Sequence, residues 1–379
     1  MSLQVMRADD SVALARFIDV PWHVHQGAGR RWVPPLRVLV RKTLDRGRDP
    51  FWGSAERALF IALRDGRPVG RIAAIENRSH NAHHGDRVGF FGFFESVEDP
   101  DIASALLAEA ESWLAERGLT AMRGPMNPSI NHECGLLVEG FDAHPVFMTP
   151  WSPPYYARLL EERGLVKERD LLGFWIPTDP AHFELTPTIV RAAERARTRL
   201  GRLTFQSLDA PGLLRNAELC RQIFNDAWRE NWAFVPIREE EFAYLARELR
   251  PLLAAQLSFL AEVNGEPAGF LVVIRDLNRI LARVPSGRLF PTGLLKLLMG
   301  VRRIRHGRIV LLGIRERYRG QHIFPLFVQE LLRRARHPSV AGIGAEASWV
   351  LEDNEGLIGP LAAMGAAPYR RWRIYKKDL

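Results

Sequence analysis

The chain has 379 residues, 47% of them hydrophobic and 25% charged, which is typical of a globular protein and long enough for two domains. No apolar run reaches the roughly 18 residues that a membrane span needs, and the N-terminus lacks the apolar core of a signal peptide, so we expect a cytoplasmic location. Two cysteines exclude a disulfide framework and a cysteine zinc site.

The net charge of +8 comes mainly from arginine. Five of the 52 basic residues are lysine, so 47 are arginine, whose planar fork can bind two oxygens of a phosphate or carboxylate at once. A nucleic acid, an anionic membrane or a phosphorylated small molecule would each suit this charge. Composition alone does not choose among these partners, and an arginine excess can also reflect codon usage.

An internal repeat organises the chain. Residues 60–77 and 259–276 match at an offset of 199, and each has a Gly-x-Pro turn between two apolar runs, which predicts a hairpin in both places. Residues 160–164 and 361–365 match at an offset of 201, each ending in the glycine that stops a helix. The repeat therefore predicts two copies of one α/β unit.

Each copy is predicted to carry one mixed sheet. The predicted domains are 1–176 and 206–379, joined by 177–205, in which a helix covers 188–200. After its hairpin, the first copy has a strand at 87–95, a helix at 100–117, a strand at 119–124, a helix at 154–163 and a strand at 167–176. The second copy has helices at 212–228 and 239–255, hairpin strands at 257–263 and 268–275, a strand at 308–314, a helix at 324–336, a strand at 343–350, a helix at 354–364 and a strand at 369–376.

A phosphate-binding arrangement is predicted in the second copy. Its central strand runs into RERYRGQHIF (315–324) and then into a helix, so free amide groups and the helix dipole would face an anion, aided by Arg315, Arg317 and Arg319. The first copy has the acidic FESVEDPDIA at this point, which would repel phosphate. The alternative interpretation is a solvated arginine turn that caps a helix.

The second copy resembles the GNAT fold of acyl-CoA-dependent N-acyltransferases. That family has a loop of the form Arg/Gln-x-x-Gly-x-Gly/Ala, and here Arg319 matches while His322 and Phe324 stand at the small positions. Asn354 matches the asparagine that approaches the pantetheine arm in many members. The tyrosine that often serves as general acid is replaced by Leu361.

A narrower resemblance covers nearly the whole chain. The segments DPFWGSAE (49–56), RGPMNPSINHECGLLVEGFD (123–142), PPYYARLLEERG (153–164) and EASWVLEDN (346–354) resemble a bacterial family of tandem GNAT-like proteins. Some of its members are implicated as ceramide synthases, which join a fatty acyl group from acyl-CoA to a sphingoid amine. The fold class that the resemblance implies is therefore two tandem GNAT-like domains in an α/β protein.

The resemblance implies an acyl-CoA or acetyl-CoA co-substrate in the second copy and no metal. Main-chain groups of Leu312, Gly313 and Ile314 are expected to pair with the pantetheine, and Asn354 to approach it. The phosphates are expected to contact the three arginines named above and the amides of Gly320, Gln321, His322 and Ile323. A primary amine would be the acyl acceptor.

Candidate catalytic residues lie in both copies. Glu346 is the first choice of base because its strand flanks the expected thioester, and its alternative role is an ion pair with an arginine. The polar loop after the strand that ends at Gly124 is expected to line the acceptor site at the junction of the copies, with His132 or Glu133 as a second base. The same loop offers Asn127, Ser129 and Asn131 for substrate binding, or it is simply a structural loop.

The second copy carries an insertion with a distinct composition. Residues 289–308 combine an apolar cluster with a run of arginines, a pattern that can lie on an anionic membrane, as at the inner membrane face, or cover an acyl chain. The alternative is a buried helix packed on the core.

Two other functions stay open from sequence. One is a non-catalytic acyl-CoA or lipid-binding protein, which the altered loop and the missing tyrosine would suit. RNA binding ranks last, because the arginines lack interleaved aromatic residues, so we expect no nucleic acid partner. His80, His83 and His84 are expected to form a surface turn without metal, and no Ser-His-Asp order is present in the sequence.

Overall fold

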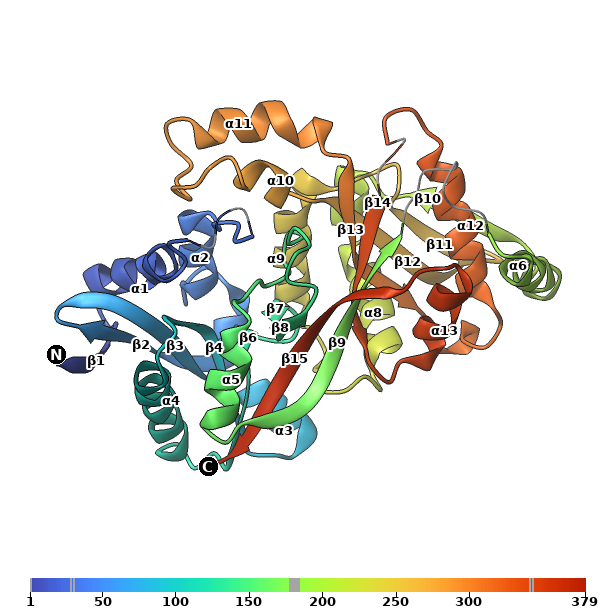
Figure 1. Ribbon diagram of the computed structural model, residues 1–379. Coiled ribbons are helices and arrows are strands. Elements are labelled where there is room, and N and C mark those ends of the chain that lie inside the picture. Colours follow the sequence, from blue (N-terminus) through green and yellow to red (C-terminus); the bar gives the residue numbers. More distant parts are fainter. Residues whose placement is uncertain (1, 28, 30, 177–184, 341, 343) are drawn as a thin grey trace. The chain divides into compact units, whose positions relative to one another are not determined.

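The computed structural model describes the chain except residues 1, 28, 30, 177–184, 341 and 343 (Figure 1). It comprises two compact units. The first contains Met1–Leu171, Asn278–Leu297 and Arg370–Leu379, and the second contains Leu172–Leu277 and Leu298–Tyr369. The chain therefore returns to the first unit with its last strand. The predicted domain limits at 176 and 206 stay a prediction, and residues 177–184 of the predicted linker lie outside the described residues.

The first unit is built on a mixed sheet. Its order is β1 (Leu3–Arg7), β2 (Ala55–Arg64), β3 (Arg67–Asn77), β4 (Val88–Ser96), β5 (Ala121–Gly124) and then β15 (Pro368–Asp378), with β8 (Leu136–Glu139) also paired to β15. Its helices are α1 (Ser11–Val24), α2 (Arg37–Leu44), α3 (Arg78–His84), α4 (Pro100–Ala115), α5 (Tyr155–Glu162) and the short α10 (Asn278–Leu281). Leu106, Leu107 and Ala110 of α4 pack on Phe60 and Ile72 of the sheet in one buried cluster.

The second unit repeats this plan. Its strand order is β10 (Leu203–Ser207), β11 (Phe259–Val263), β12 (Glu266–Arg275), β13 (His306–Ile314) and β14 (Gly344–Leu351), followed by β9 (Val166–Ile176), which passes from the first unit into the second. Its helices are α6 (Pro187–Leu200), α7 (Ala210–Arg215), α8 (Ala217–Trp228), α9 (Glu239–Leu249), α12 (Ile323–Ala335) and α13 (Glu355–Ala363). The predicted helix at 188–200 is confirmed as α6.

The two predicted hairpins are confirmed and share one turn geometry. Strands β2 and β3 pair up to Arg64 and Arg67, and β11 and β12 pair up to Val263 and Glu266. The turn residues Asp65–Gly66 and Asn264–Gly265 all have positive φ, between 49° and 82°. Such a turn matches the twist of two adjoining strands and favours Asp-Gly and Asn-Gly. The repeat seen in the sequence is therefore a repeat of structure.

In both units the central strand separates from its parallel neighbour partway along. Strand β4 pairs with β5 only from Val88 to Phe90, and β13 pairs with β14 only from His306 to Ile309. Beyond these points the strand ends part. A helix follows each central strand, α4 in the first unit and α12 in the second. Each unit thus has a strand end beside a helix N-terminus, where a ligand could meet main-chain groups.

Several predicted elements needed correction. The helix expected at 212–228 is divided at Asn216, whose side-chain amide donates to the Gly212 carbonyl and ends α7. The helix expected at 239–255 ends at Leu249 and is followed by a 3-10 turn at Arg250–Leu252, because Pro251 has no amide hydrogen to continue the α-helical bonding. Strands β1 and β10 and helix α3 were not predicted. His80 lies on α3 and is buried, so the expected surface turn was wrong.

Candidate active site

In the second unit, the end of β13 has main-chain groups that no strand of the described chain pairs with. The Arg315 amide donates to the Ala268 carbonyl of β12 at 2.9 Å, and because such groups alternate along an antiparallel strand, those of Leu312 and Ile314 face the other edge. Gly313 faces β12, where an added Cβ would lie 2.9 Å from the Phe270 ring. No strand of the described chain pairs with this edge beyond Ile309. It is the edge on which the pantetheine is expected.

The loop after β13 leads to a helix without a side-chain cap. His322 stands at the N-cap of α12 in a left-handed conformation and accepts no capping hydrogen bond. Among the described residues, none accepts from the amides of Gly320, His322, Ile323 and Phe324. Gly320 has φ +71°, and an added Cβ would meet nothing within 4 Å, so the loop is open there. Free amides at the start of a 13-residue helix form a favourable site for an anion.

Two of the three loop arginines make polar contacts within the protein. Arg317 pairs with Glu266 at 2.6 Å, and Arg319 donates to the Ala227 carbonyl and lies 3.9 Å from Glu230. The buried Nε atom of Arg315 has no hydrogen-bond partner. The guanidinium groups of Arg317 and Arg319 thus tie the loop to β12 and to the end of α8. Their expected contact with phosphate would have to compete with these bonds.

The last turn of α8 contacts one main-chain group expected to receive the ligand, the Leu312 carbonyl, and one group in the loop that follows, the Glu316 amide. The Asp226 carboxylate accepts from the Glu316 amide at 2.9 Å, and Trp228 Nε1 donates to the Leu312 carbonyl at 3.0 Å. The Trp228 ring stacks on Phe224 with centroids 5.0 Å apart. Sequence analysis did not find these residues, because nothing in a helical pattern shows which side chains face a strand end.

Glu346 lies at the centre of a buried hydrogen-bond cluster. It is fully buried, and its carboxylate accepts from the Ser348 hydroxyl at 2.6 Å and from the Tyr369 hydroxyl. Arg308 donates from Nε to Ser348 Oγ at 3.0 Å and lies over the Trp349 ring at 4.5 Å. The two hydroxyls satisfy the carboxylate. They also give it two routes for proton exchange.

Tyr369 supplies a phenol that the sequence seemed to lack. Leu361, which stands at the usual tyrosine position, is buried in the hydrophobic core of the second unit. The Tyr369 hydroxyl instead bonds to Glu346 from the start of β15. Asn354 precedes α13, and its side chain makes no capping hydrogen bond to the helix. Its amide is therefore not committed to capping.

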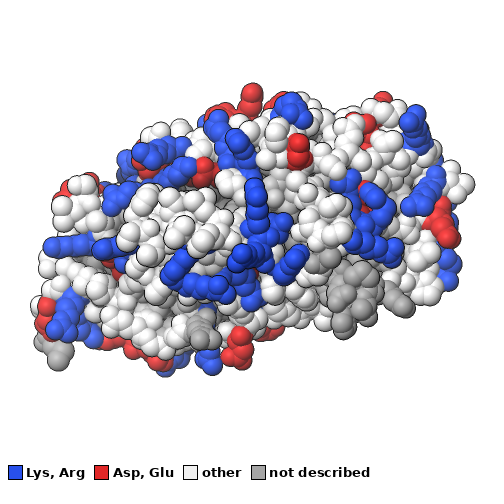
Figure 2. All heavy atoms as spheres, turned by 90° about the horizontal axis from the view of Figure 1, so that it is seen from above, with Lys and Arg blue, Asp and Glu red and all other residues white. Residues whose placement is uncertain are grey.

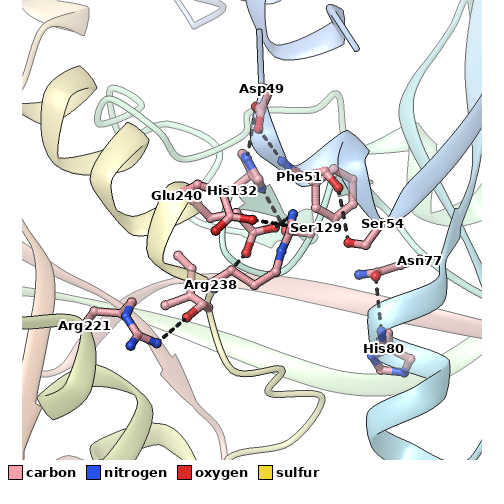
Figure 3. A network of polar contacts seen from close by, with 12 residues as sticks. Asp49, Phe51, Ser54, Asn77, His80, Ser129, His132, Arg221, Arg238 and Glu240 are labelled. Carbon is pink, nitrogen blue, oxygen red and sulfur yellow. Dashed lines mark hydrogen bonds and ion pairs between the residues drawn. The ribbon is translucent and has the colours of Figure 1, made fainter. Parts of the chain in front are cut away.

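In the first unit, two segments that carry the family resemblance meet at His132. His132 Nδ1 lies 2.8 Å from the Ser129 hydroxyl, and Nε2 lies 3.5 Å from the Asp49 carboxylate (Figure 3). The ring also packs edge-on against Phe51 at 5.6 Å. Asp49 and Ser129 are buried, with 4% and 7% of their surface exposed. The fold thus assembles an Asp-His-Ser set, although the sequence lacks the usual order.

This arrangement can relay a proton. If the Ser129 hydroxyl donates to Nδ1, the imidazole carries its own proton on Nε2, where the Asp49 carboxylate faces it. A proton taken up through Ser129 would then be held on an imidazolium next to a carboxylate. The segment DPFWGSAE was the sequence signal for Asp49, but nothing in it pointed to His132.

The remaining candidates of this loop have structural positions. Asn127 Oδ1 accepts from the Phe93 amide at 2.5 Å, and residues Met126–Asn127 pair with Glu133–Cys134 as β6 and β7. The Asn131 amide donates to Ser129 Oγ at 3.3 Å. Asn127 therefore fills the space where β4 parts from β5. Of the five candidates from this loop, the structure brings Ser129, Asn131 and His132 into direct contact with one another.

A second polar cluster lies at the end of β4. The Glu95 carboxylate contacts His25 Nε2 at 2.7 Å, the Tyr156 hydroxyl at 2.8 Å and Arg71 at 3.6 Å. Burial alone would raise the pKa of Glu95, but His25 and Arg71, together with these hydrogen bonds, lower it overall. Burial and the neighbouring Glu95 raise the pKa of Tyr156. This acidic residue of the first copy is thus neutralised inside the fold.

No group of three or more His, Cys, Asp or Glu residues within the described part of the chain is placed to hold a metal ion. The His80 and His84 rings lie 4.4 Å apart, and His80 Nε2 is 3.5 Å from Asp86 without a hydrogen bond. Burial lowers the pKa of His80 to about 4, so the ring is neutral.

Comparison with known proteins gives two relatives over most of the chain. Protein YghO of Escherichia coli is 33% identical over 352 residues, covering 92% of this chain and 88% of the relative. A protein named bacterial ceramide synthase from Caulobacter vibrioides is 32% identical over 385 residues, covering 100% and 98% of the two chains. No family model matches the chain.

Solved structures share the fold at low identity. A tandem GNAT protein from the clavulanic acid biosynthesis pathway superposes with a TM-score of 0.57 at 14% identity, covering 100% of this chain and 98% of the other. A GCN5-related N-acetyltransferase from Sphaerobacter thermophilus gives 0.55 at 14% identity, covering 99% and 95%. These likenesses confirm the predicted tandem GNAT fold.

Proposed function

Because the chain belongs to the tandem GNAT-fold family that includes protein YghO and the Caulobacter ceramide synthase, and is an acyltransferase, we propose that it joins a long acyl group from acyl-CoA to a sphingoid base. The comparisons support acyl transfer in general, and the acyl-CoA donor and the primary amine acceptor are part of this proposal. The long acyl group and the lipid amine are proposed from the name of one relative. Each of these two levels can be tested separately.

One observation carries the assignment of the acyl-CoA to the second unit. The unpaired edge of Leu312 and Ile314 leads directly to the four free amides at the start of α12. Pantetheine offers amide groups that suit a strand edge, and the CoA phosphates suit a helix N-terminus. In this proposal, Trp228 leaves the Leu312 carbonyl when the pantetheine binds.

The chemistry follows from the cluster around Glu346. The amine nitrogen attacks the thioester carbonyl carbon, a C–N bond forms, and the C–S bond breaks. The Tyr369 hydroxyl protonates the leaving thiolate, and Glu346 takes the proton lost by the amine and returns one to Tyr369. Because Glu346 is fully buried, the amine proton reaches it through Ser348 or Tyr369.

The first unit contributes the acceptor side in this proposal. His132, backed by Asp49 and contacting Ser129, would keep the amine unprotonated before attack, and Asn131 lies beside the same hydroxyl. Glu133 is the alternative base. Asn127 would act indirectly, since its side chain holds the Phe93 amide.

The experiment is thermal stabilisation of the full chain by CoA, acetyl-CoA and palmitoyl-CoA, followed by an assay with sphinganine as acceptor. A ligand at about a hundred times its Kd adds about 2.7 kcal/mol to the stability. The largest shift is expected with palmitoyl-CoA, together with formation of the N-acyl product. No shift with any thioester would overturn the acyl-CoA assignment. Equal shifts with acetyl-CoA and product only from small amines would overturn the lipid substrate alone.

A further inference from the structure

Exposed apolar side chains gather on one short segment. Eight large hydrophobic residues are exposed in the described chain, and four fall within ten residues: Phe290, Leu295, Leu298 and Met299, with 68, 56, 70 and 58% of their surface exposed. The last three lie on helix α11 (Gly293–Gly300) at the i, i+3, i+4 spacing that places them on one face. Only Gly293 of this helix is buried, so the helix does not pack into the core.

The segment leading into α11 is firmly attached to the first unit. Trp22 Nε1 donates to the Pro285 carbonyl at 2.8 Å, and Arg37 donates from Nε to the Ser286 carbonyl and from its amide to the Gly287 carbonyl, both at 2.9 Å. An added Cβ at Gly287 would lie 2.3 Å from the Trp22 ring. The apolar face of α11 is therefore presented from a fixed base.

The charge around this apolar face has one sign. Residues 277–315 contain nine Lys or Arg residues and no Asp or Glu. Arg302, Arg303 and Arg305 follow the helix and are exposed, and Lys296 is exposed within it. Figure 2 views the side on which α11 lies in Figure 1, with Lys and Arg side chains in blue. Such a surface attracts anions.

We propose that α11 and the arginines after it dock on the surface of an anionic lipid bilayer. Leu295, Leu298 and Met299 would enter the headgroup boundary while Arg302 and Arg303 contact lipid phosphates. Among the described residues no helix is long and apolar enough to span a membrane. An eight-residue helix instead suits a position in the interface plane. Acidic residues, which a partner-protein interface would usually mix with basic ones, are absent from the segment.

Vesicle co-sedimentation of the full chain tests the proposal. Vesicles of phosphatidylcholine with phosphatidylglycerol are compared with pure phosphatidylcholine, at low and at high salt. We expect the protein to sediment with the anionic vesicles only, and salt to weaken binding because it screens the arginines. Equal binding to both vesicles, or none to either, would contradict the proposal.

Matched variants locate the contact. L295Q with L298Q is expected to lower the partition coefficient more than about tenfold, and R302Q with R303Q about fivefold per charge. The controls are V38Q with V166Q, two exposed apolar residues elsewhere, and R195Q with R199Q on α6, which should bind as the unaltered chain does. If the controls lose as much binding as the α11 variants, the contact is not at α11.

Self-association is the competing use of this face. Sedimentation velocity without lipid would then show a concentration-dependent dimer that L295Q with L298Q abolishes, and that result would overturn the bilayer proposal. The proposal stands apart from acyl transfer, because vesicle binding needs no acyl-CoA. Its failure would leave the thermal shift with acyl-CoA unchanged.

Discussion

The ends of the two central strands, β4 and β13, have the same position in their units. They differ in the groups that bond to them. Register places Ser96 of β4 opposite Gly70, and Ile314 of β13 opposite Gly269, the matching glycine of the repeat. In the first unit, Asn127 bonds the strand, and the Glu95 cluster occupies its end. In the second unit, no strand of the described chain pairs with the corresponding edge, no described group accepts from the amides at the start of α12, and Trp228 bonds to the Leu312 carbonyl.

The difference shows how a duplicated unit can divide its tasks. Each buried amide or carbonyl needs a hydrogen-bond partner. A gap between two strands can therefore bind a ligand only if the main-chain groups along it are not already bonded to the protein itself. The first unit bonds the groups at the end of β4 with side chains of its own. In the second unit, the proposed ligand would bond to the corresponding groups, of which the Glu316 amide now bonds to Asp226 and the Leu312 carbonyl to Trp228.

The largest expected effect separates the buried carboxylates of the two units. Glu346→Gln should lower kcat about a hundredfold to ten-thousandfold, since an amide cannot take the amine proton, while the thermal shift with acyl-CoA is kept. Glu95→Gln should lower the stability but leave kcat per folded molecule unchanged. Steady-state kinetics with thermal shift measurements check both. Unchanged turnover of Glu346→Gln would remove it from the mechanism.

At Gly92, where β4 parts from β5 in the first unit, an added side chain should not be tolerated. An added Cβ at Gly92 would lie 1.7 Å from the Met126 carbonyl oxygen, so Gly92→Ala should lower the free energy of unfolding by about 3 kcal/mol or prevent folding. The corresponding stretch of β13 carries Val310 and Leu311. Gly359→Ala on α13, where nothing lies within 4 Å, should leave the stability equal or higher. Urea unfolding compares the two variants. An unchanged free energy of unfolding for Gly92→Ala would argue against close packing of β4 on the Met126 carbonyl.

Acid should destabilise the first unit through His80. Its pKa is about 4 in the folded chain and about 6.5 when unfolded, so between these values the unfolded chain binds more protons. Stability should fall from about pH 6.5 and lose about 3 kcal/mol by pH 4, at 1.36 kcal/mol per pKa unit.

His80→Phe should reduce this slope in urea unfolding measured across pH. His83→Gln should leave it unaltered, because His83 is exposed. The same slope in His80→Phe as in the unaltered chain would assign the acid sensitivity to other groups.

A smaller effect is expected at the loop of the second unit. Asp226→Asn keeps a carbonyl oxygen for the Glu316 amide but removes a negative charge next to the expected phosphates, so CoA should bind roughly fivefold more tightly, about 1 kcal/mol. Asp99→Asn at the N-cap of α4 is the control in the first unit and should change only stability. Calorimetric titration measures both, and weaker binding by Asp226→Asn would mean that the carboxylate organises the site.

Much of the fold could be predicted because the repeat is local. Gly66 and Gly265 mark hairpin turns in the sequence, and the glycines at 164 and 365 mark helix ends. The short outer strands β1 and β10 carry no such mark. The insertion helix was expected either on a surface or in the core, and exposure decides for the surface.

Site residues that lie in one continuous segment could be predicted from the sequence. Site residues that are far apart in the sequence could not. The loop 315–324 and the segment around His132 are continuous in sequence. Asp49 lies 80 residues before Ser129, and Tyr369 lies 23 residues after Glu346, so only the fold brings them together. The candidate arginines were chosen for charge, but Arg317 and Arg319 have partners within the protein.

Hydrogen–deuterium exchange with and without CoA tests the central claim most directly, that the second unit holds the acyl-CoA and the first does not. We predict slower exchange at residues 312–324, where the strand edge and the free amides lie, and no change at residues 92–103, the matching stretch of the first unit. Protection at 92–103, or protection of neither stretch under saturating CoA, would contradict the account.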